Sequence, residues 1–350
     1  MTSRFDRSAL WQLTWTRMLA FLREPEALFW VFAFPIVLAL ALGLAYRNQG
    51  PQPVAIGVQS GAGADSAFAA LARSRDLKVT VFDSTAADLA LRNGRVALLV
   101  RPRPAPDPPV LVFDPKRPES RLAQLATIDA LERASGREDR VRPAIDIRER
   151  RGGRYIDFLL PGLIGLNLLG TGMWGIGFPI ATARQQKLLK RMLATPMRRS
   201  DYLLSLMLAR LVWLVMEVAA VLGFGMLAFG VQVRGPWLAF ALVSLLGAFS
   251  FSALGLLVAS RARTIEAVSG LMNVAMLPMW LLSGSFFSAD RFPTAMQWLV
   301  QALPLTAVNN ALRAIMNEGA GLAAVSAPIG IIVAWGVAGF FASLALFRWE

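Results

Sequence analysis

The stretch RQQKLLKRMLATPMRRSDY, residues 184–202, lies between two long apolar runs and decides how the rest of the chain is interpreted. It carries six cations and one anion, Asp201. Its leucines and methionine recur at helical spacing, and Pro196 disfavours helical geometry at Thr195, so we predict a short amphipathic basic helix that ends there. A basic loop this short between membrane spans is expected to face the cytoplasm. Two interpretations stay open: an anchor on lipid headgroups, or a helix that docks onto a cytoplasmic subunit.

The composition is that of an integral membrane protein. The 350 residues are 55% hydrophobic, and the mean hydropathy is +0.50. The net charge is +13, but the basic residues are divided among loops between apolar runs, so topology explains the charge and we expect no nucleic-acid partner. The absence of cysteine and histidine excludes disulfides, thiolate nucleophiles and metal sites with those ligands. The composition still permits a magnesium or calcium site made of carboxylates alone. Nevertheless, we predict neither a metal site nor a catalytic residue in this chain.

Residues 1–26 predict an amphipathic helix that lies in the membrane interface on the cytoplasmic side. Trp11 and Trp15 are four residues apart on one stripe, and Arg17 is one of four arginines on the polar side. The alternative is an ordinary basic leader before an uncleaved anchor. The uncharged run 27–45 follows, is about long enough to cross a membrane, and is expected to be retained as the first span. Pro35 is expected to kink it.

Residues 46–157 differ from the rest of the chain, because long apolar runs give way to Gly, Pro, Asp and Arg. Strand-like runs at 54–59, 78–82, 95–100 and 109–113 alternate with helical patterns at 64–75, 85–93 and 118–136. Ser84 is expected to cap the second of these helices and Gly94 to end it. The alternation predicts a small α/β domain, placed outside the cell if residues 1–26 are inside.

The remaining apolar runs predict five further spans and complete the fold class. That class is a membrane all-α bundle of six transmembrane helices, with an α/β extracytoplasmic domain inserted between helices 1 and 2. Six glycines in the second span and small residues in the fourth predict close helix packing. The predicted boundaries are 158–182, 203–230, 237–260, 267–284 and 325–347 for spans two to six, 183–202 for the basic loop, and 285–323 for extracytoplasmic re-entrant or surface helices.

The distribution of cations fixes the predicted orientation. The short inner segments hold thirteen Lys or Arg residues, whereas the short outer segments hold three. This excess places both termini in the cytoplasm of a bacterial cell with the chain in its inner membrane.

Three polar side chains inside the spans are candidates for a transport pathway: Asn167, Glu217 and Asn273. An intramembrane carboxylate is costly and is a functional candidate by default. The alternative for Glu217 is a structural partnership with Arg210, which lies two helical turns away on the same span.

Four features of the chain resemble the permease subunits of ABC transporters of the ABC-2, or type-2 transmembrane domain, class. Three are the stretches YIDFLLPGLIGL at 155–166, RQQKLLKRMLATPMRR at 184–199 and SGSFFSADRFPTAMQWLVQALPL at 283–305. The fourth is the layout, in which an outer domain follows the first span. The resemblance covers nearly the whole chain. It departs at Gln185 and Gln186, where the family usually has acidic residues.

The resemblance implies ATP-driven transport, most often export, by two permease chains and two ATP-binding subunits. The sequence has no GxxxxGK[ST] loop, so we expect ATP and magnesium on the partner subunit and no enzymatic activity in this chain. By analogy, the helix at 184–195 couples to that subunit. The implied coupling residues are Arg184, Lys187, Leu188, Leu189, Arg191, Met192 and Pro196, and the implied N-terminal interface residues are Trp11, Trp15 and Arg17.

The substrate class follows weakly from the spans, and other functions stay open. An apolar, glycine-rich pathway suits a hydrophobic compound, drug or lipid, as in multidrug efflux. We expect a homo- or heterodimer in the lipid membrane and leave a periplasmic adaptor open as a further partner. The other classes are an ion-coupled secondary transporter that uses Glu217 and a membrane sensor whose outer domain binds a ligand.

Overall fold

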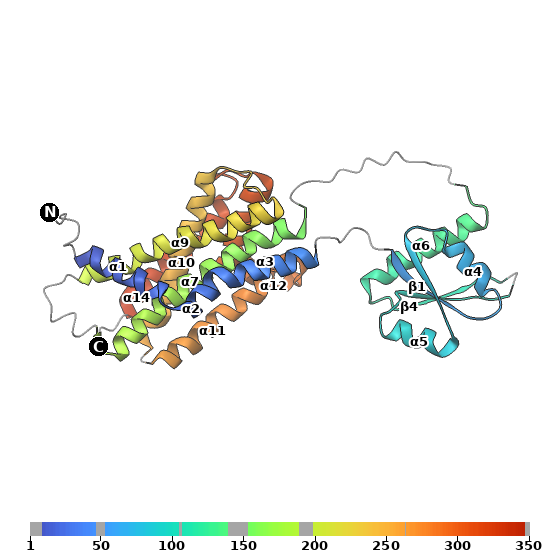
Figure 1. The fold of residues 1–350 in the computed structure, drawn as a ribbon, viewed down its shortest axis with the longest axis horizontal. Helices are drawn as coiled ribbons and strands as arrows, with labels where there is room; N and C mark the ends of the chain where they lie inside the picture. The colour runs from blue at the N-terminus through green and yellow to red at the C-terminus, as the bar shows by residue number, and fades with distance from the viewer. Residues whose placement is uncertain are drawn as a thin grey trace. The chain divides into compact units, whose positions relative to one another are not determined.

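The structure is a computed structural model that describes residues 9–46, 53–104, 107–138, 153–188, 199–262 and 264–346. The chain forms two compact units, which Figure 1 shows. The helical unit contains Met1–Arg47 and Glu149–Glu350, and the α/β unit contains Asn48–Arg148.

Six helices of the helical unit are long and apolar enough to cross a membrane, judged over the described residues. Their number agrees with the six apolar runs in the sequence, and they define a multi-pass membrane protein. The segments are Pro25–Ala45, Tyr155–Gln185 (α7), Leu208–Phe229 within α9 (Arg199–Phe229), Trp237–Arg261 (α10), Ile265–Leu282 (α11) and Ser326–Leu346 (α14). A shorter helix, α1 (Ala9–Leu22), precedes them.

The first span is not a uniform α-helix. It consists of α2 (Pro25–Leu28), a π-helical turn η2 (Phe29–Ala33) and α3 (Phe34–Ala45). The π turn ends at Ala33, two residues before Pro35, the residue whose ring and missing N–H disturb the regular hydrogen-bond ladder. The structure therefore shows a widened turn just before Pro35, and the predicted kink stays a prediction.

Helix α7 lies at the centre of the helical unit and packs against α9, α10, α11 and the short helix α13 (Pro304–Arg313). Its glycines let α10 approach closely. A Cβ atom added at Gly172 would lie 2.7 Å from the Cβ atom of Phe251, and one added at Gly255 would lie 2.6 Å from the carbonyl oxygen of Met173. The close packing predicted at the glycines of the second span and at the small residues of the fourth is confirmed, and the structure shows that these two spans pack against each other.

The region after α11 contains short helices: η3 (Ala289–Arg291), α12 (Thr294–Ala302), α13 (Pro304–Arg313) and η4 (Ala314–Glu318). Helix α13 is largely buried against α7, α10 and α14, so of the two predicted alternatives it is not a surface helix. Arg313 holds its end in place. The guanidinium donates to the carbonyl oxygens of Phe158 (3.2 Å) and Gly284 (2.5 Å) and lies 3.7 Å from the centroid of the Phe158 ring.

The α/β unit is a four-stranded sheet in the order β2-β1-β3-β4, with helices on both faces. Its strands are β1 (Val54–Gln59), β2 (Leu77–Phe82), β3 (Leu98–Arg101) and β4 (Val110–Phe113); its helices are α4 (Ala64–Leu71), α5 (Ser84–Arg92) and α6 (Pro118–Ala134). Strands β1, β2 and β3 are parallel, and β4 is antiparallel to β3. Figure 1 shows α4 and α6 on one side of the sheet and α5 on the other.

Some predicted boundaries in this unit are wrong. The third strand begins three residues later than predicted, at Leu98, and α4 ends at Leu71 because a turn follows it. Asp83, and not Ser84, caps α5: its carboxylate accepts a hydrogen bond of 2.7 Å from the backbone N–H of Ala86. Asp and Ser are nearly equivalent caps in sequence, so only the backbone geometry distinguishes them.

Candidate functional site

The basic loop begins with an arginine that binds the C-terminal end of another span. The Arg184 guanidinium donates hydrogen bonds to the carbonyl oxygens of Ala259 (2.8 Å), Ser260 (3.2 Å) and Ala262 (2.7 Å). The last carbonyls of a helix have no partner inside it, so Arg184 caps the C-terminus of α10. The start of the basic loop is thereby tied to the fourth span as well as the second.

The other predicted coupling residues are placed only in part. Lys187 adopts a left-handed backbone with φ of 55°, which ends α7 in the manner of a C-terminal cap residue. Lys187 and Leu188 are both exposed to solvent. Leu189, Arg191, Met192 and Pro196 lie outside the described residues, so the predicted helix at 184–195 stays a prediction.

Helix α1 packs along the start of α9, next to the basic loop. The Nε atom of Arg17 donates to the hydroxyl of Ser205 at 3.3 Å. Trp11 and Trp15 stack at 6.4 Å between ring centroids, and about half the surface of each side chain is exposed. About half of each indole is therefore exposed, whereas Arg17 joins α1 to α9.

A buried polar group joins the first three spans. Arg210 Nη1 lies 2.9 Å from Glu217 Oε1, and Arg210 Nη2 donates to the hydroxyl of Thr171 at 2.5 Å. The Thr171 hydroxyl also lies 3.0 Å from Glu217 Oε2. One helical turn away, the amide of Asn167 donates to the carbonyl of Val31 in the π turn (3.1 Å). The partnership of Glu217 with Arg210, one of two sequence interpretations, is present in the structure.

Two of the three predicted pathway residues lie together. Asn167 and Glu217 line one shallow recess with Ile164, Leu168, Val218 and Val221, and the recess has no space for a water molecule. Asn273 does not line it and is exposed on α11 between the exposed side chains of Leu271 and Val274. Within the described residues, no group of three or more His, Cys, Asp or Glu side chains could hold a metal ion.

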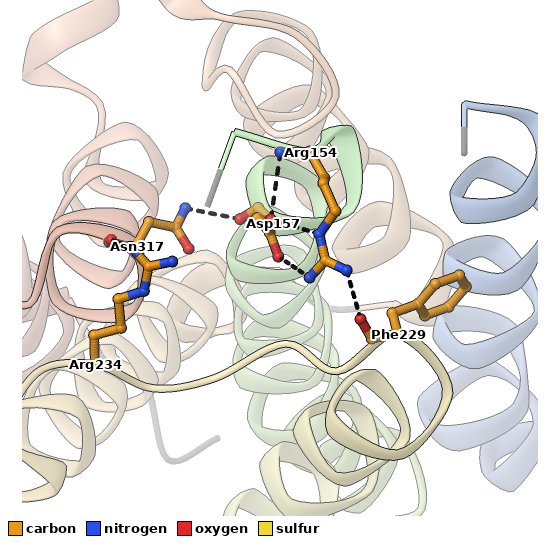
Figure 2. Close-up of polar contacts among 5 residues, drawn as sticks. All are labelled: Arg154, Asp157, Phe229, Arg234 and Asn317. Carbon is orange, nitrogen blue, oxygen red and sulfur yellow. Dashed lines mark hydrogen bonds and ion pairs between the residues drawn. The ribbon is translucent and has the colours of Figure 1, made fainter. Parts of the chain in front are cut away.

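A second polar cluster lies at the N-terminal end of α7, the end opposite Arg184, and is shown in Figure 2. The Arg154 guanidinium binds both carboxylate oxygens of Asp157 (2.8 and 3.0 Å) and donates to the carbonyl of Phe229 at the end of α9 (2.7 Å). The amide of Asn317 in η4 donates to the Asp157 carbonyl (2.8 Å), and Arg234 donates to the Asn317 carbonyl (2.9 Å). We call these five residues the outer clamp, because the topology predicted from the sequence places them on the outer side.

The two charges of the outer clamp differ in burial. The Asp157 side chain is 4% exposed, whereas that of Arg154 is 52% exposed. Hydrogen bonding to Asp157 raises the pKa of the Arg154 guanidinium above its ordinary value, so the guanidinium stays charged. The 155–166 stretch was one of the motifs behind the family resemblance, but the sequence alone assigned no role to Asp157 or to Arg154. The spacing of an acidic residue three positions into a helix is the signal that could have found the pair.

Six helices long and apolar enough to cross a membrane, with a buried charge pair between two of them, define a multi-pass membrane protein. The sequence profile of the family described as ABC-2 type transporter matches residues 128–317, more than half of the chain. The chain therefore belongs to the ABC-2 type transporter family, and the resemblance drawn from the sequence is confirmed. Members of this family are membrane transport components that work with an ATP-binding subunit.

Individual relatives cover parts of the chain. It is similar to ABC transporter G family member 20 of Dictyostelium discoideum, with 26% identity over 169 residues, 48% of this chain and 23% of the relative. It is also similar to Nodulation protein J of Rhizobium meliloti strain 1021, with 29% identity over 203 residues, 56% of this chain and 75% of the relative. Nodulation protein J of Bradyrhizobium diazoefficiens is 28% identical over 210 residues, with the same shares of each chain. The chain thus spans less than a quarter of the length of the Dictyostelium relative.

Proposed function

We propose that this chain is the permease subunit of an ATP-driven exporter of a hydrophobic compound, drug or lipid. ATP and magnesium bind to a separate ATP-binding subunit, which docks onto the basic loop and onto α1. The observation that carries the proposal is the Arg184 cap. The start of the basic loop is bonded to the inner end of α10, so a push on the loop moves the second and fourth spans together.

Helix α7 supplies the path for that motion. It is continuous from Tyr155 to Gln185, 31 residues, or about 46 Å at 1.5 Å per residue. Its inner end carries Arg184, and its outer end carries Asp157 of the outer clamp. A rigid rod bonded at both ends transmits displacement from the cytoplasmic loop to the outer surface, as a rigid-body switch between inward and outward states requires.

Glu217 serves this mechanism as a positioning residue between α7 and α9. A carboxylate held by an arginine on one side and a hydroxyl on the other favours a fixed ion pair over a proton carrier. The ion-coupled alternative needs a Glu217 that releases and takes up protons. We expect Glu217→Gln to leave membrane insertion intact and to reduce ATP-dependent export, and proton-driven transport without an ATPase would favour the alternative.

Two copies of the chain form the pathway, because one six-helix bundle supplies half of a two-fold arrangement. The exposed Asn273 supports this proposal. An amide on an otherwise apolar face of α11 is costly in lipid and favourable when it binds across a helix interface. The assembly lies in a bacterial inner membrane with both termini in the cytoplasm and the α/β unit outside.

Co-purification with the ATP-binding subunit tests the proposal. Changing Leu188, Leu189 and Met192 together to Asp removes the apolar side of the predicted coupling helix. We expect the triple variant to retain less than a tenth of the ATP-binding subunit that the wild type retains. The control is the double variant Gln185→Asp and Gln186→Asp, which adds negative charge to the same loop and keeps the apolar residues. Full retention by the triple variant, or transport by the chain alone, would contradict the proposal.

A further inference from the structure

The charged residues of the α/β unit are separated between the two ends of its sheet. Because β1, β2 and β3 are parallel and β4 is antiparallel to β3, the starts of the first three strands and the end of β4 lie at one end. This end, which we call the basic end, carries eight Lys or Arg and three Asp or Glu in residues 72–78, 92–97 and 114–121. The opposite, acidic end carries four Lys or Arg and seven Asp or Glu in residues 59–66, 83–88, 101–104, 107 and 129–138. Together the two ends hold every charged residue in the described part of the unit.

Ion pairing also differs between the two ends. At the acidic end, three of the four Lys or Arg are ion-paired, among them Arg101 with Asp88 at 2.7 Å. At the basic end, Arg117 lies 3.8 Å from Asp114. The other seven Lys or Arg at the basic end are exposed, and none forms an ion pair with a described residue. Like charges gathered without counter-charges attract anions, so the basic end is suited to an anionic surface.

The chain enters the α/β unit at the basic end through a short connection. Seven residues separate Tyr46, which caps the first span, from Val54, the first residue of β1. Seven fully extended residues reach about 25 Å. The connection that leaves the acidic end is longer, because 20 residues lie between Ala134 of α6 and Tyr155 of α7. The short tether therefore keeps the basic end within reach of the membrane that holds the helical unit.

We propose that the basic end of the α/β unit binds the headgroups of anionic phospholipids on the membrane surface beside the first span. Such a surface attracts clustered Lys and Arg side chains, and the attraction falls off within roughly 8–10 Å at physiological salt. The tether gives the two a high effective concentration, so weak individual contacts add up. An acidic protein could use the same charges but would have to be recruited, whereas the lipid is always present. The inference needs only that the helical unit lies in a membrane, and it is independent of the transported substrate and of the orientation.

Fluorescence quenching tests the contact, because the natural sequence contains no cysteine that would compete for a label. Full-length Asn93→Cys carries a fluorophore between Arg92 and Arg95 and is placed in nanodiscs that include a lipid with a nitroxide on its headgroup. We expect quenching to be at least about twofold stronger with about one third phosphatidylglycerol than with phosphatidylcholine alone, and this difference to disappear in about 1 M salt. The matched control is Ser60→Cys, which is exposed at the acidic end and is expected to respond equally to both lipids. Equal quenching of Asn93→Cys in the two lipids would overturn the proposal, as would the same lipid response at Ser60→Cys.

Removal of charge separates a specific surface from an effect of net charge. In the Asn93→Cys background, Arg92→Gln with Arg95→Gln removes two unpaired cations and is expected to lower the lipid-dependent quenching at least about twofold. The control pair, Arg103→Gln with Arg133→Gln, removes the same charge from the acidic end and is expected to leave the quenching unchanged. Equal losses in the two pairs would contradict binding through the basic end. A label at Asn93→Cys that is shielded in cell membranes but not in nanodiscs would assign this end to a protein partner and overturn the lipid contact.

Discussion

Four arginines of the helical unit each bind a group on a different element. Arg154 reaches the end of α9, Arg184 the end of α10, Arg210 a hydroxyl on α7, and Arg313 the end of α11. Three of these contacts are to backbone carbonyls near helix ends, where acceptors have no partner inside the helix. A guanidinium offers five donors in a fixed fork and is less strongly hydrated than an ammonium group, so it suits such sites better than lysine does.

The unequal burial of the outer clamp predicts unequal effects of mutation. Arg154→Ala leaves the nearly buried Asp157 carboxylate without its partner, and we expect a loss of about 3 kcal/mol. Asp157→Asn still accepts a backbone hydrogen bond and leaves Arg154 in contact with water, so we expect a loss of about 1 kcal/mol. Thermal unfolding of the detergent-solubilised protein measures both. A larger effect of Asp157→Asn would contradict the geometry of the clamp.

Asp83 predicts a pH effect confined to α5. The backbone N–H of Ala86 and the hydroxyl of Thr85 lower the pKa of the Asp83 carboxyl below its ordinary value. A carboxyl with a lowered folded-state pKa stabilises above the unfolded value of about 3.9, and the contribution is lost as the pH falls through the folded-state pKa. Asp83→Asn caps the helix without ionising. The measured quantity is the hydrogen-exchange rate of the α5 amides in the wild type divided by the rate in Asp83→Asn, taken at each pH. We expect this ratio to rise as the pH falls below about 3.9. A ratio that does not change with pH would exclude this role of Asp83.

The packing of the helices in the helical unit depends on which glycines contact a neighbouring helix. Gly172 faces Phe251, whereas Gly170, half a turn earlier on α7, has no other atom within 4 Å of the place where a Cβ would lie. The same residue type therefore has two different roles on one helix. Lipid does not drive apolar helices together, so close backbone approach at such points supplies much of the packing energy.

This difference gives a matched pair of substitutions. We expect Gly172→Ala to destabilise the solubilised protein by roughly 1–3 kcal/mol, because α7 and α10 must separate. Gly170→Ala meets no neighbour and reduces the backbone freedom of the unfolded chain, so its expected effect is neutral or stabilising. Thermal midpoints of the two variants check the order. Equal midpoints would show that α7 and α10 do not cross at Gly172.

At the scale of the whole molecule, the chain divides into a helical unit and an α/β unit inserted after the first span. Inside the helical unit, the two ends of this insertion lie together, because the rings of Tyr46 and Tyr155 are 4.3 Å apart between centroids. The outer clamp begins at the adjacent Arg154. The insertion therefore leaves and rejoins the membrane unit at one place, next to the residues that fix the start of α7.

The orientation of the chain is open to a direct test with single cysteines. Ser135 lies in the α/β unit and Gln186 in the basic loop, and both are exposed. We expect a membrane-impermeant maleimide to label Ser135→Cys in intact bacterial spheroplasts and Gln186→Cys only after lysis. The unaltered chain, which has no cysteine, is the control. The reverse pattern would invert the proposed topology.

Local sequence patterns were sufficient to predict most secondary-structure elements. The six apolar runs and the strand at 54–59 each depend on residues within one segment. The outer clamp could not be predicted in the same way, because Asp157, Phe229 and Asn317 come from three segments far apart in sequence. Asn273 was grouped with Asn167 and Glu217 on residue type alone, and rotation of α11 about its axis decides that it faces outward.

By itself, the sequence determined that this chain has six segments able to span a membrane and to which family it belongs, and it predicted which loops face inward. Those properties depend on hydropathy, charge and local motifs, which add up along the chain without reference to distant residues. Only the tertiary structure decided that Arg184 caps α10, that Glu217 is held by Arg210 and Thr171, and which glycines bear contacts. The physical reason is that a side chain's partner is set by how helices cross and rotate, and no single segment contains that information.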